Sequence, residues 1–256
     1  MISRHDNLEL SIWGEDRSRV EIGVMEENIK RGDTVVDIGA NIGLFTLLYA
    51  RAVGERGRVF AFEPEPVNVG ILRRNIAANG YNNIEVVPAA VGDRPGKVKL
   101  FLSDFNAGDH RVYDPEERTR DWEKNGAVYD KLVGDRRKAI DVPTVSLDEF
   151  LKSYEKPIAF IKMDAQGAEG GILKGMTEIL KKNRNVRMVT EFWPAGLKMF
   201  GVEAQEFLTL LQGLGFSFCE IGNDARERRQ NKDFLLHKYT VENNRSVDLL
   251  VSRTLL

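Results

Sequence analysis

The stretch of sequence that decides the fold is residues 34–50, which read TVVDIGANIGLFTLLYA. Its first residues are apolar and mostly β-branched, which is typical of a buried strand in a parallel sheet. Asp37 follows near the end of this strand, and Gly39 and Gly43 form a turn. Leucines at helical spacing come directly after the turn. A strand, a glycine turn and a helix in this order predict a pocket beyond the sheet edge, where α/β folds bind nucleotides.

The charge of Asp37 narrows the class of ligand that this pocket can hold. The Gly-x-Gly-x-x-Gly spacing of a dinucleotide site is absent, and an anion beside the turn would repel a pyrophosphate at the helix N-terminus. A ligand with a cationic ammonium group suits the site better. The simpler alternative is a turn that only lets strand and helix pack closely. The combination of Asp37 with Asn41 favours a cofactor site over that alternative.

A second acid lies at the end of the next expected strand, residues 58–63. Glu63 follows Gly43 by 20 residues, and a carboxylate at this place can accept hydrogen bonds from both hydroxyls of a ribose. NAD and S-adenosylmethionine (SAM) both carry that ribose, so the spacing does not separate them. Pro66 then predicts the first turn of a helix that ends near Gly80.

The remaining pattern alternates strands and helices, which predicts an α/β fold with a doubly wound, mostly parallel sheet. The further strands are expected at 84–91, 98–102, 140–145, 158–164, 186–191, 216–221 and 246–252, and the further helices at 147–151, 165–180 and 203–214. A weak strand at 8–13 and a helix from Val20 to about Gly32 suggest an N-terminal elaboration over residues 1–31. Residues 226–232 read as a solvated turn. We expect a single domain over residues 1–256.

Polar residues dominate the segment 103–141, where the regular pattern stops. A connection of this length inside a compact domain is usually a functional lid or a disordered segment. We interpret it as an insertion that covers the acceptor of the reaction. His110 lies in this insertion among polar neighbours, close to the expected exit of a strand.

Composition excludes several classes of function. The 256 residues include 37 Lys plus Arg and 39 Asp plus Glu, which gives a formal charge of −2. The chain therefore lacks the excess of positive charge that is typical of nucleic-acid-binding proteins. The single cysteine, Cys219, excludes a disulfide framework and a multi-cysteine zinc site. No apolar run reaches the roughly 20 residues of a membrane-spanning helix, and the first residues lack the apolar core of a secretory signal. We therefore expect a cytoplasmic protein.

The Asp-x-Gly-x-Asn-x-Gly pattern of residues 37–43 resembles motif I of the class I SAM-dependent methyltransferases. The sequence of residues 35–46, VVDIGANIGLFT, is similar to the corresponding motif of the FkbM family, and Phe62-Glu63-Pro64 resembles the second motif of that family. Residues 161–169, IKMDAQGAE, resemble the family's Ile-Lys-x-Asp-x-Glu-Gly-x-Glu, with Gln166 where glutamate is commoner.

The resemblance implies a seven-stranded core with an antiparallel strand near the C-terminus. It implies SAM as the cofactor and the hydroxyls of sugars or secondary metabolites as methyl acceptors. The residues expected to bind the cofactor are Asp37, Gly39, Asn41, Gly43, Glu63 and Asp164.

Four acids fall at expected strand ends, namely Asp37, Glu63, Asp164 and Glu191, so they should share one rim. Methyl transfer to a hydroxyl needs alignment of the reactants and a base for the hydroxyl proton. His110 is the first candidate for that base because imidazole titrates near neutral pH, although an exposed loop histidine is the plain alternative. Asp164 could serve instead. Asp164 and Glu191 could also hold a divalent cation, but two oxygen ligands define no site, and we predict no resident metal.

Two other functions remain open for this sequence. One is a nicotinamide-dependent oxidoreductase, against which the missing glycine spacing and Asp37 count. The other is a SAM-binding domain without turnover, against which the intact set of Asp37, Glu63 and Asp164 counts.

Overall fold

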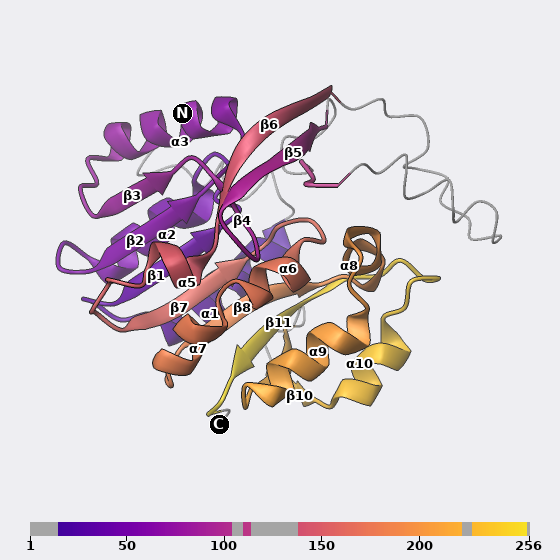
Figure 1. Cartoon of the computed structure of the whole chain (residues 1–256). Helices are drawn as coiled ribbons and strands as arrows, with labels where there is room; N and C mark the ends of the chain where they lie inside the picture. Colours follow the sequence, from indigo (N-terminus) through magenta and orange to yellow (C-terminus); the bar gives the residue numbers. More distant parts are fainter. Residues whose placement is uncertain (1–14, 104–109, 114–137, 222–226, 255–256) are drawn as a thin grey trace.

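The computed structural model describes residues 15–103, 110–113, 138–221 and 227–254. In these residues the main sheet has eight strands in the order β10-β9-β11-β8-β7-β1-β2-β3 (Figure 1). The strands are β1 Thr34–Ile38, β2 Arg58–Phe62, β3 Ile84–Val87, β7 Ile158–Met163, β8 Arg187–Phe192, β9 Ser217–Ile221, β10 Glu227–Gln230 and β11 Val247–Ser252.

The five strands from β8 to β3 pair in parallel. Strand β11 runs antiparallel to both β8 and β9, and β10 runs antiparallel to β9. The predicted doubly wound, mostly parallel sheet is therefore confirmed, together with the antiparallel strand near the C-terminus. The sheet is one strand larger than the seven expected, because β10 adds an outer strand.

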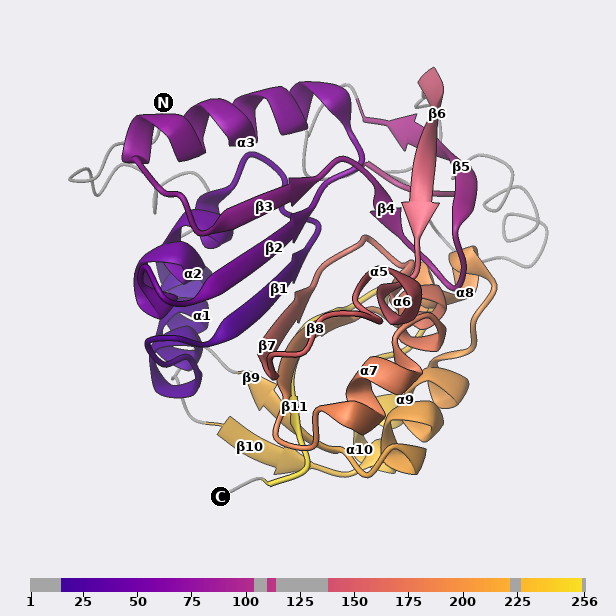
Figure 2. The ribbon, with the colours of Figure 1, turned by 60° about the vertical axis from the view of Figure 1, so that its left-hand side comes forward.

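Helices cover both faces of this sheet, as Figure 2 shows. Their bounds are α1 Glu15–Asn28, α2 Leu44–Val53, α3 Pro66–Asn79, α5 Leu147–Phe150, α6 Glu169–Lys174, α7 Thr177–Lys182, α8 Pro194–Phe200, α9 Ala204–Gly213 and α10 Lys232–Lys238. One face packs against α1, α2 and α3, where Val35 and Val59 meet buried side chains such as Tyr49 of α2. The other face packs against α5, α6, α7, α9 and α10.

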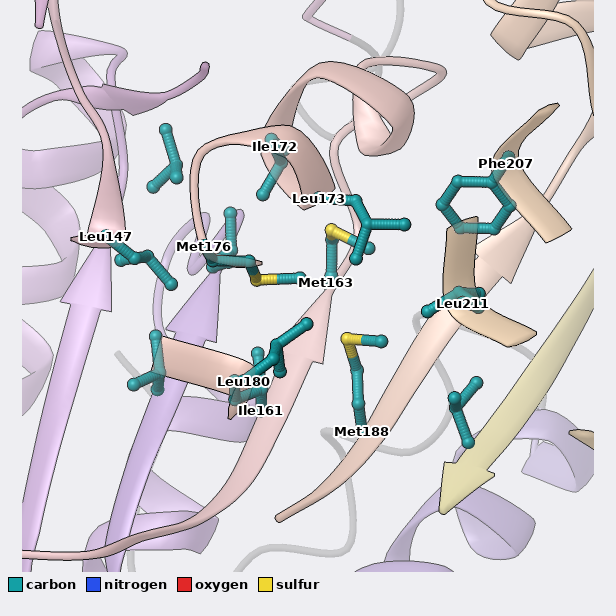
Figure 3. Close-up of a cluster of buried hydrophobic side chains, with 14 of the residues drawn as sticks. Leu147, Ile161, Met163, Ile172, Leu173, Met176, Leu180, Met188, Phe207 and Leu211 are labelled. Carbon is teal, nitrogen blue, oxygen red and sulfur yellow. The ribbon is translucent and has the colours of Figure 1, made fainter. Parts of the chain in front are cut away.

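The larger core lies on that second face (Figure 3). Met163 and Met188, from adjacent strands, contribute fully buried side chains to it, as do Leu173, Leu180 and Leu211 from the helices. Each such side chain contributes about 1.5–3 kcal/mol when it leaves water. Because β-strand side chains alternate between faces, β7 can send Ile161 and Met163 into this core while its neighbouring positions face the helices of the other side.

A second, three-stranded sheet lies apart from the first, in the order β4-β6-β5. It consists of β4 Ala90–Val91, β5 Gly96–Leu102 and β6 Lys138–Val145. Residues 110–113 return along the outside of β5, where the backbone of Arg111 exchanges hydrogen bonds of 2.7 and 3.1 Å with Phe101. Strand β6 begins at Lys138, two residues before the predicted strand. This small sheet places His110 beside the main sheet.

Four local predictions are wrong. The strand expected at 84–91 is divided between the two sheets, as β3 and β4. The helix expected over 165–180 is two helices, α6 and α7, separated at Gly175. A side chain at Gly175 would place its Cβ 2.0 Å from the carbonyl oxygen of Gly92, so the close approach of another loop interrupts the helix there. The solvated turn expected at 226–232 contains β10 and the start of α10. Helix α1 begins at Glu15, five residues before the expected start.

The short charged strand β10 has no apolar alternation that could have predicted it. Its residues are Glu-Arg-Arg-Gln, and its backbone pairs with β9 in register from Glu227 opposite Ile221. Charged residues on an outer strand discourage further pairing with other chains. The expected strand at 8–13 lies outside the described residues.

Candidate functional site

A cavity of about 250 Å³ opens at the carboxyl ends of β1, β2, β7 and β8. The four acids predicted to share a rim all line it: Asp37, Glu63, Asp164 and Glu191. Gly39, Asn41 and His110 line it as well. Gly43 is absent from the lining. It lets the turn pack closely against α3, because a Cβ at this position would lie 2.4 Å from Cδ1 of Leu72.

The turn after β1 is fixed by backbone conformations that favour glycine. Gly39 and Gly43 have φ angles of 80° and 98°, and Asn41, between them, has a φ of 50°. Asparagine tolerates this left-handed region better than most residues. A Cβ at Gly39 would lie 2.0 Å from the carbonyl oxygen of Asp164, so only glycine lets the turn approach the end of β7. The turn and the loop after β7 thus form one wall of the cavity.

Glu63 is the acceptor that joins this turn to the end of β2. Its Oε2 accepts a hydrogen bond of 2.8 Å from the backbone N–H of Asn41, and its Oε1 accepts one of 2.9 Å from that of Glu65. The side chain is 5 % exposed. Burial raises the pKa of Glu63 to about 7, against the lowering effect of these hydrogen bonds. A carboxylate has about four lone-pair positions, so this one can accept further bonds from a ligand.

Asp37 is buried on β1, where it is 1 % exposed. Its Oδ2 accepts a hydrogen bond of 2.5 Å from the hydroxyl of Thr46 on α2. Its Oδ1 is buried and has no hydrogen-bond partner among the described residues. Burial raises the pKa of Asp37, and the charge of Lys162 opposes that rise. A buried carboxylate oxygen without a donor, at a cavity wall, calls for a cationic ligand group.

Lys162 was not among the predicted site residues. It lines the cavity from β7, is 7 % exposed, and donates to Oδ2 of Asp164 over 3.3 Å. Its Nζ lies 5.2 Å from the centre of the Phe45 ring. The sequence did hold a signal for it, because a lysine inside an apolar central strand is almost never buried without a partner.

Asp164 follows β7, and its side chain is 43 % exposed toward the cavity. Besides the ion pair with Lys162, its Oδ1 accepts a hydrogen bond of 2.9 Å from Nε2 of Gln166. Gln166 has a φ of 54° and also lines the cavity. The amide at this position therefore donates to Asp164, which a glutamate carboxylate could not do.

His110 reaches the same cavity from the segment beside β5. Its Nδ1 accepts a hydrogen bond of 3.0 Å from the backbone N–H of Ser103. In a neutral imidazole one nitrogen accepts and the other carries the proton. This bond therefore assigns the proton of a neutral His110 to Nε2.

Two further carboxyl groups with raised pKa are those of Glu191, within β8, and Glu169, at the start of α6. Burial, with the nearby negative charges of Asp164, Glu169 and Asp248, raises the pKa of Glu191 to about 8. Burial likewise raises the pKa of Glu169, at the start of α6, to about 7. Across residues 15–103, 110–113, 138–221 and 227–254, no group of three or more His, Cys, Asp or Glu side chains could hold a metal ion. Within the same ranges no helix is both long and apolar enough to cross a membrane.

This donor set fits the cofactor that the sequence predicts. The orphaned oxygen of Asp37 suits an ammonium group, Glu63 can accept from ribose hydroxyls, and Gly39 lets the turn pack against the backbone of Asp164 at the cavity wall. Phe62, Ala89 and other apolar residues of the lining suit an aromatic base.

Comparisons with known proteins identify relatives of this chain. Methyltransferase sdnD of Sordaria araneosa is 31 % identical over 187 residues, which cover 67 % of this chain and 71 % of that protein. The 2-O-methyltransferase NoeI of Sinorhizobium fredii is 27 % identical over 156 residues, 60 % of this chain and 62 % of that protein. A solved structure of a putative rRNA-methylase from Clostridium thermocellum aligns with 98 % of this chain and 97 % of its own, at 11 % identity and a TM-score of 0.48. Residues 37–218 match the methyltransferase FkbM domain, so this chain belongs to the FkbM family of methyltransferases, with SAM as its cofactor.

Proposed function

We propose that this methyltransferase is an O-methyltransferase that transfers the methyl group of SAM to a hydroxyl of a small molecule, a sugar or a secondary metabolite. The observation that carries the proposal is that one cavity contains both halves of the required chemistry. Asp37 and Glu63 line it with acceptors suited to the cofactor, and His110 and Asp164 line it with groups that can take a proton. One relative, NoeI, is named a 2-O-methyltransferase, which supports an oxygen acceptor.

In this proposal the buried acids hold the cofactor. Asp37 accepts from the ammonium group through its unpartnered Oδ1, and Glu63 accepts from the ribose hydroxyls. Gly39, Asn41 and Gly43 shape the turn that brings these acids together. The backbone of Asp164 packs against that turn, and its side chain lines the cavity, where it would face both the cofactor and the acceptor.

The bound cofactor supplies a methyl group that is electrophilic because it is attached to a sulfonium. The protein then has two tasks: to align the acceptor hydroxyl with that methyl group, and to remove the hydroxyl proton as the bond forms. Residues 103–141 are proposed as the lid over the acceptor. Support comes from His110 and Val112, which line the cavity, whereas residues 104–109 and 114–137 of this lid lie outside the described residues.

The hydrogen bond at His110 separates two routes for the proton. If His110 is the base, the acceptor hydroxyl has to replace the N–H of Ser103 at Nδ1, since Nε2 carries the proton in the neutral ring. If Asp164 is the base, His110 can instead donate from Nε2 to the acceptor oxygen. Both routes use His110 and Asp164, the two residues that the sequence predicts. If His110 is the base, a His110 variant should lose the pH dependence of the rate, and if Asp164 is the base, an Asp164 variant should lose it.

The test is to incubate the protein with methyl-labelled SAM and fractionated host metabolites, and to locate the label in the product by NMR. We expect the label on an ether oxygen. A label on nitrogen or carbon would refute O-methylation while leaving the family assignment intact. The control variant is His237→Ala, which changes an exposed histidine of α10 outside the cavity and should retain activity.

A further inference from the structure

Lys162 places a positive charge inside the central strand β7, next to β1. In the parallel pairing of these strands, Lys162 lies opposite Asp37. Side chains at paired positions of neighbouring strands point to the same face of the sheet. The lysine and the buried aspartate are therefore neighbours on the face that α2 covers, where the amine lies over the ring of Phe45.

Three charges meet at this point of the cavity wall. Asp37 and Asp164 are acids, and Lys162 is the cation that faces both: it donates to Asp164 over 3.3 Å and lowers the pKa of Asp37 through its charge. The groups that act on Asp37 are Lys162 and Asp164 from β7 and its exit, and Thr46 from α2, which does not titrate. Burial and the charge of Asp164 raise the pKa of Asp37, so Lys162 is the charged group that opposes both.

We propose that Lys162 is a positioning residue for the cofactor, whose charge favours the carboxylate form of Asp37 before the cofactor binds, so that this carboxylate can accept from the ammonium group of SAM. The inference rests on the proposed role of Asp37 in cofactor binding. The lysine does not touch the transferred methyl group in this account. It acts through Asp37, and its removal should change the pH dependence of cofactor binding.

The direction of that change follows from the titration of Asp37. Without Lys162 the buried acid holds its proton to a higher pH. Below its pKa the ionised fraction of an acid falls about tenfold per pH unit. Affinity for a ligand with an ammonium group should therefore decrease toward acid pH more steeply in a Lys162→Met variant than in the wild type, where Glu63, with a pKa of about 7, also titrates over this range.

The experiment is calorimetry of S-adenosylhomocysteine binding at pH 6, 7 and 8. At pH 8 we expect Lys162→Met to bind within about threefold of the wild type, and at pH 6 at least about tenfold more weakly. Lys162→Arg retains the charge and should restore the wild-type profile. Lys181→Met removes an exposed lysine of α7, paired with Glu178, and serves as the control.

A double variant tests whether the effect passes through Asp37. In Asp37→Asn/Lys162→Met the acid opposite position 162 is gone. The affinity should be low, and the extra weakening at pH 6 that Lys162→Met shows relative to the wild type should disappear, while the change due to Glu63, with a pKa of about 7, remains. If Lys162→Met alone fails to fold, the same double variant should fold, because it no longer buries an unbalanced carboxylate. A profile of Lys162→Met parallel to that of the wild type would overturn the inference, as would a double variant that keeps the extra weakening at pH 6 or fails to fold. Failure of the wild-type protein to bind S-adenosylhomocysteine would instead refute the proposed cofactor site.

Discussion

Replacing Glu63 by alanine tests the cofactor half of the cavity most directly. The side chain is buried and accepts from two backbone N–H groups, those of Asn41 and Glu65. The substitution therefore removes the proposed ribose acceptor and also leaves two backbone donors without their partner. Both effects have the same origin, the loss of one carboxylate, but they are measured differently.

The expected magnitudes follow from these bonds. Hydrogen bonds to a charged acceptor contribute about 1.5–3 kcal/mol. If the ribose bonds are lost, S-adenosylhomocysteine should bind roughly 10- to 150-fold more weakly. The two orphaned N–H groups should lower the free energy of unfolding by about 1–3 kcal/mol, because the turn around Asn41 loses its tie to β2. Calorimetry measures the first quantity, and urea unfolding measures the second.

Glu65→Ala is the matched control for this experiment. Glu65 is equally buried, at 5 % exposed, and its carboxylate accepts a 2.6 Å bond from the backbone N–H of Asn68 as the cap of α3. Loss of such a cap costs about 0.5–2 kcal/mol, so stability falls by a comparable amount. Cofactor affinity should stay near that of the wild type, since Glu65 is absent from the cavity lining. Equal losses of affinity in the two variants would show that the Glu63 effect is only local loosening, and an unchanged affinity in Glu63→Ala would place the ribose elsewhere.

Three further predictions concern the turn, the buried acids and the base. Gly39→Ala should lower the free energy of unfolding by roughly 2–5 kcal/mol and abolish S-adenosylhomocysteine binding, because the new Cβ would collide with the carbonyl oxygen of Asp164. Gly80→Ala is the control: its Cβ would have no atom within 4 Å, so it should cost only the backbone strain of about 1–2 kcal/mol and leave binding intact. Glu169 binds its proton more tightly in the folded state, with a pKa of about 7 against 4.5, so folding stability should fall as pH rises from about 4.5 to 7. In urea titrations, the free energy of unfolding of Glu169→Gln should decrease less than that of the wild type over that range, by up to roughly 3 kcal/mol. Identical pH profiles for the two proteins would contradict this. If His110 is the base, His110→Ala should lower turnover by a factor on the order of 10²–10⁴ with cofactor affinity retained. Near-normal turnover that chelator abolishes and Mg²⁺ restores would instead indicate a metal held by Asp164 and its neighbours.

The fold was predictable because its central strands carry their pattern locally. The β-branched run before Asp37 is buried throughout β1, and the acids at 37, 63 and 164 mark where the parallel strands end. The elements that were missed depend on contacts across the chain. Strand β10 forms because β9 offers it a partner, and the helix after Asp164 breaks because the loop at Gly92 presses against Gly175. Gly92 lies 83 residues before Gly175, so no local window could show that contact; β10 is only six residues from its partner at Glu227 and Ile221, but it has no apolar alternation to mark it.

In the site, too, the residues of the motifs were predictable, whereas the contacts between distant residues were not. Glycine spacing and strand-end acids were enough to bring Asp37, Glu63 and Asp164 into one cavity. The motif could not show that Lys162 faces the first of these acids, because that contact depends on the register between two strands more than 120 residues apart. Nor could it show that the backbone of Ser103 occupies Nδ1 of His110. The first contact places a positive charge beside Asp37, and the second leaves the proton of a neutral His110 on Nε2, and the motif contains neither piece of information. In other chains with this motif, the residue on β7 that lies opposite the aspartate of β1 is therefore the first to compare, since we propose that its charge influences whether that aspartate is ionised when the cofactor binds.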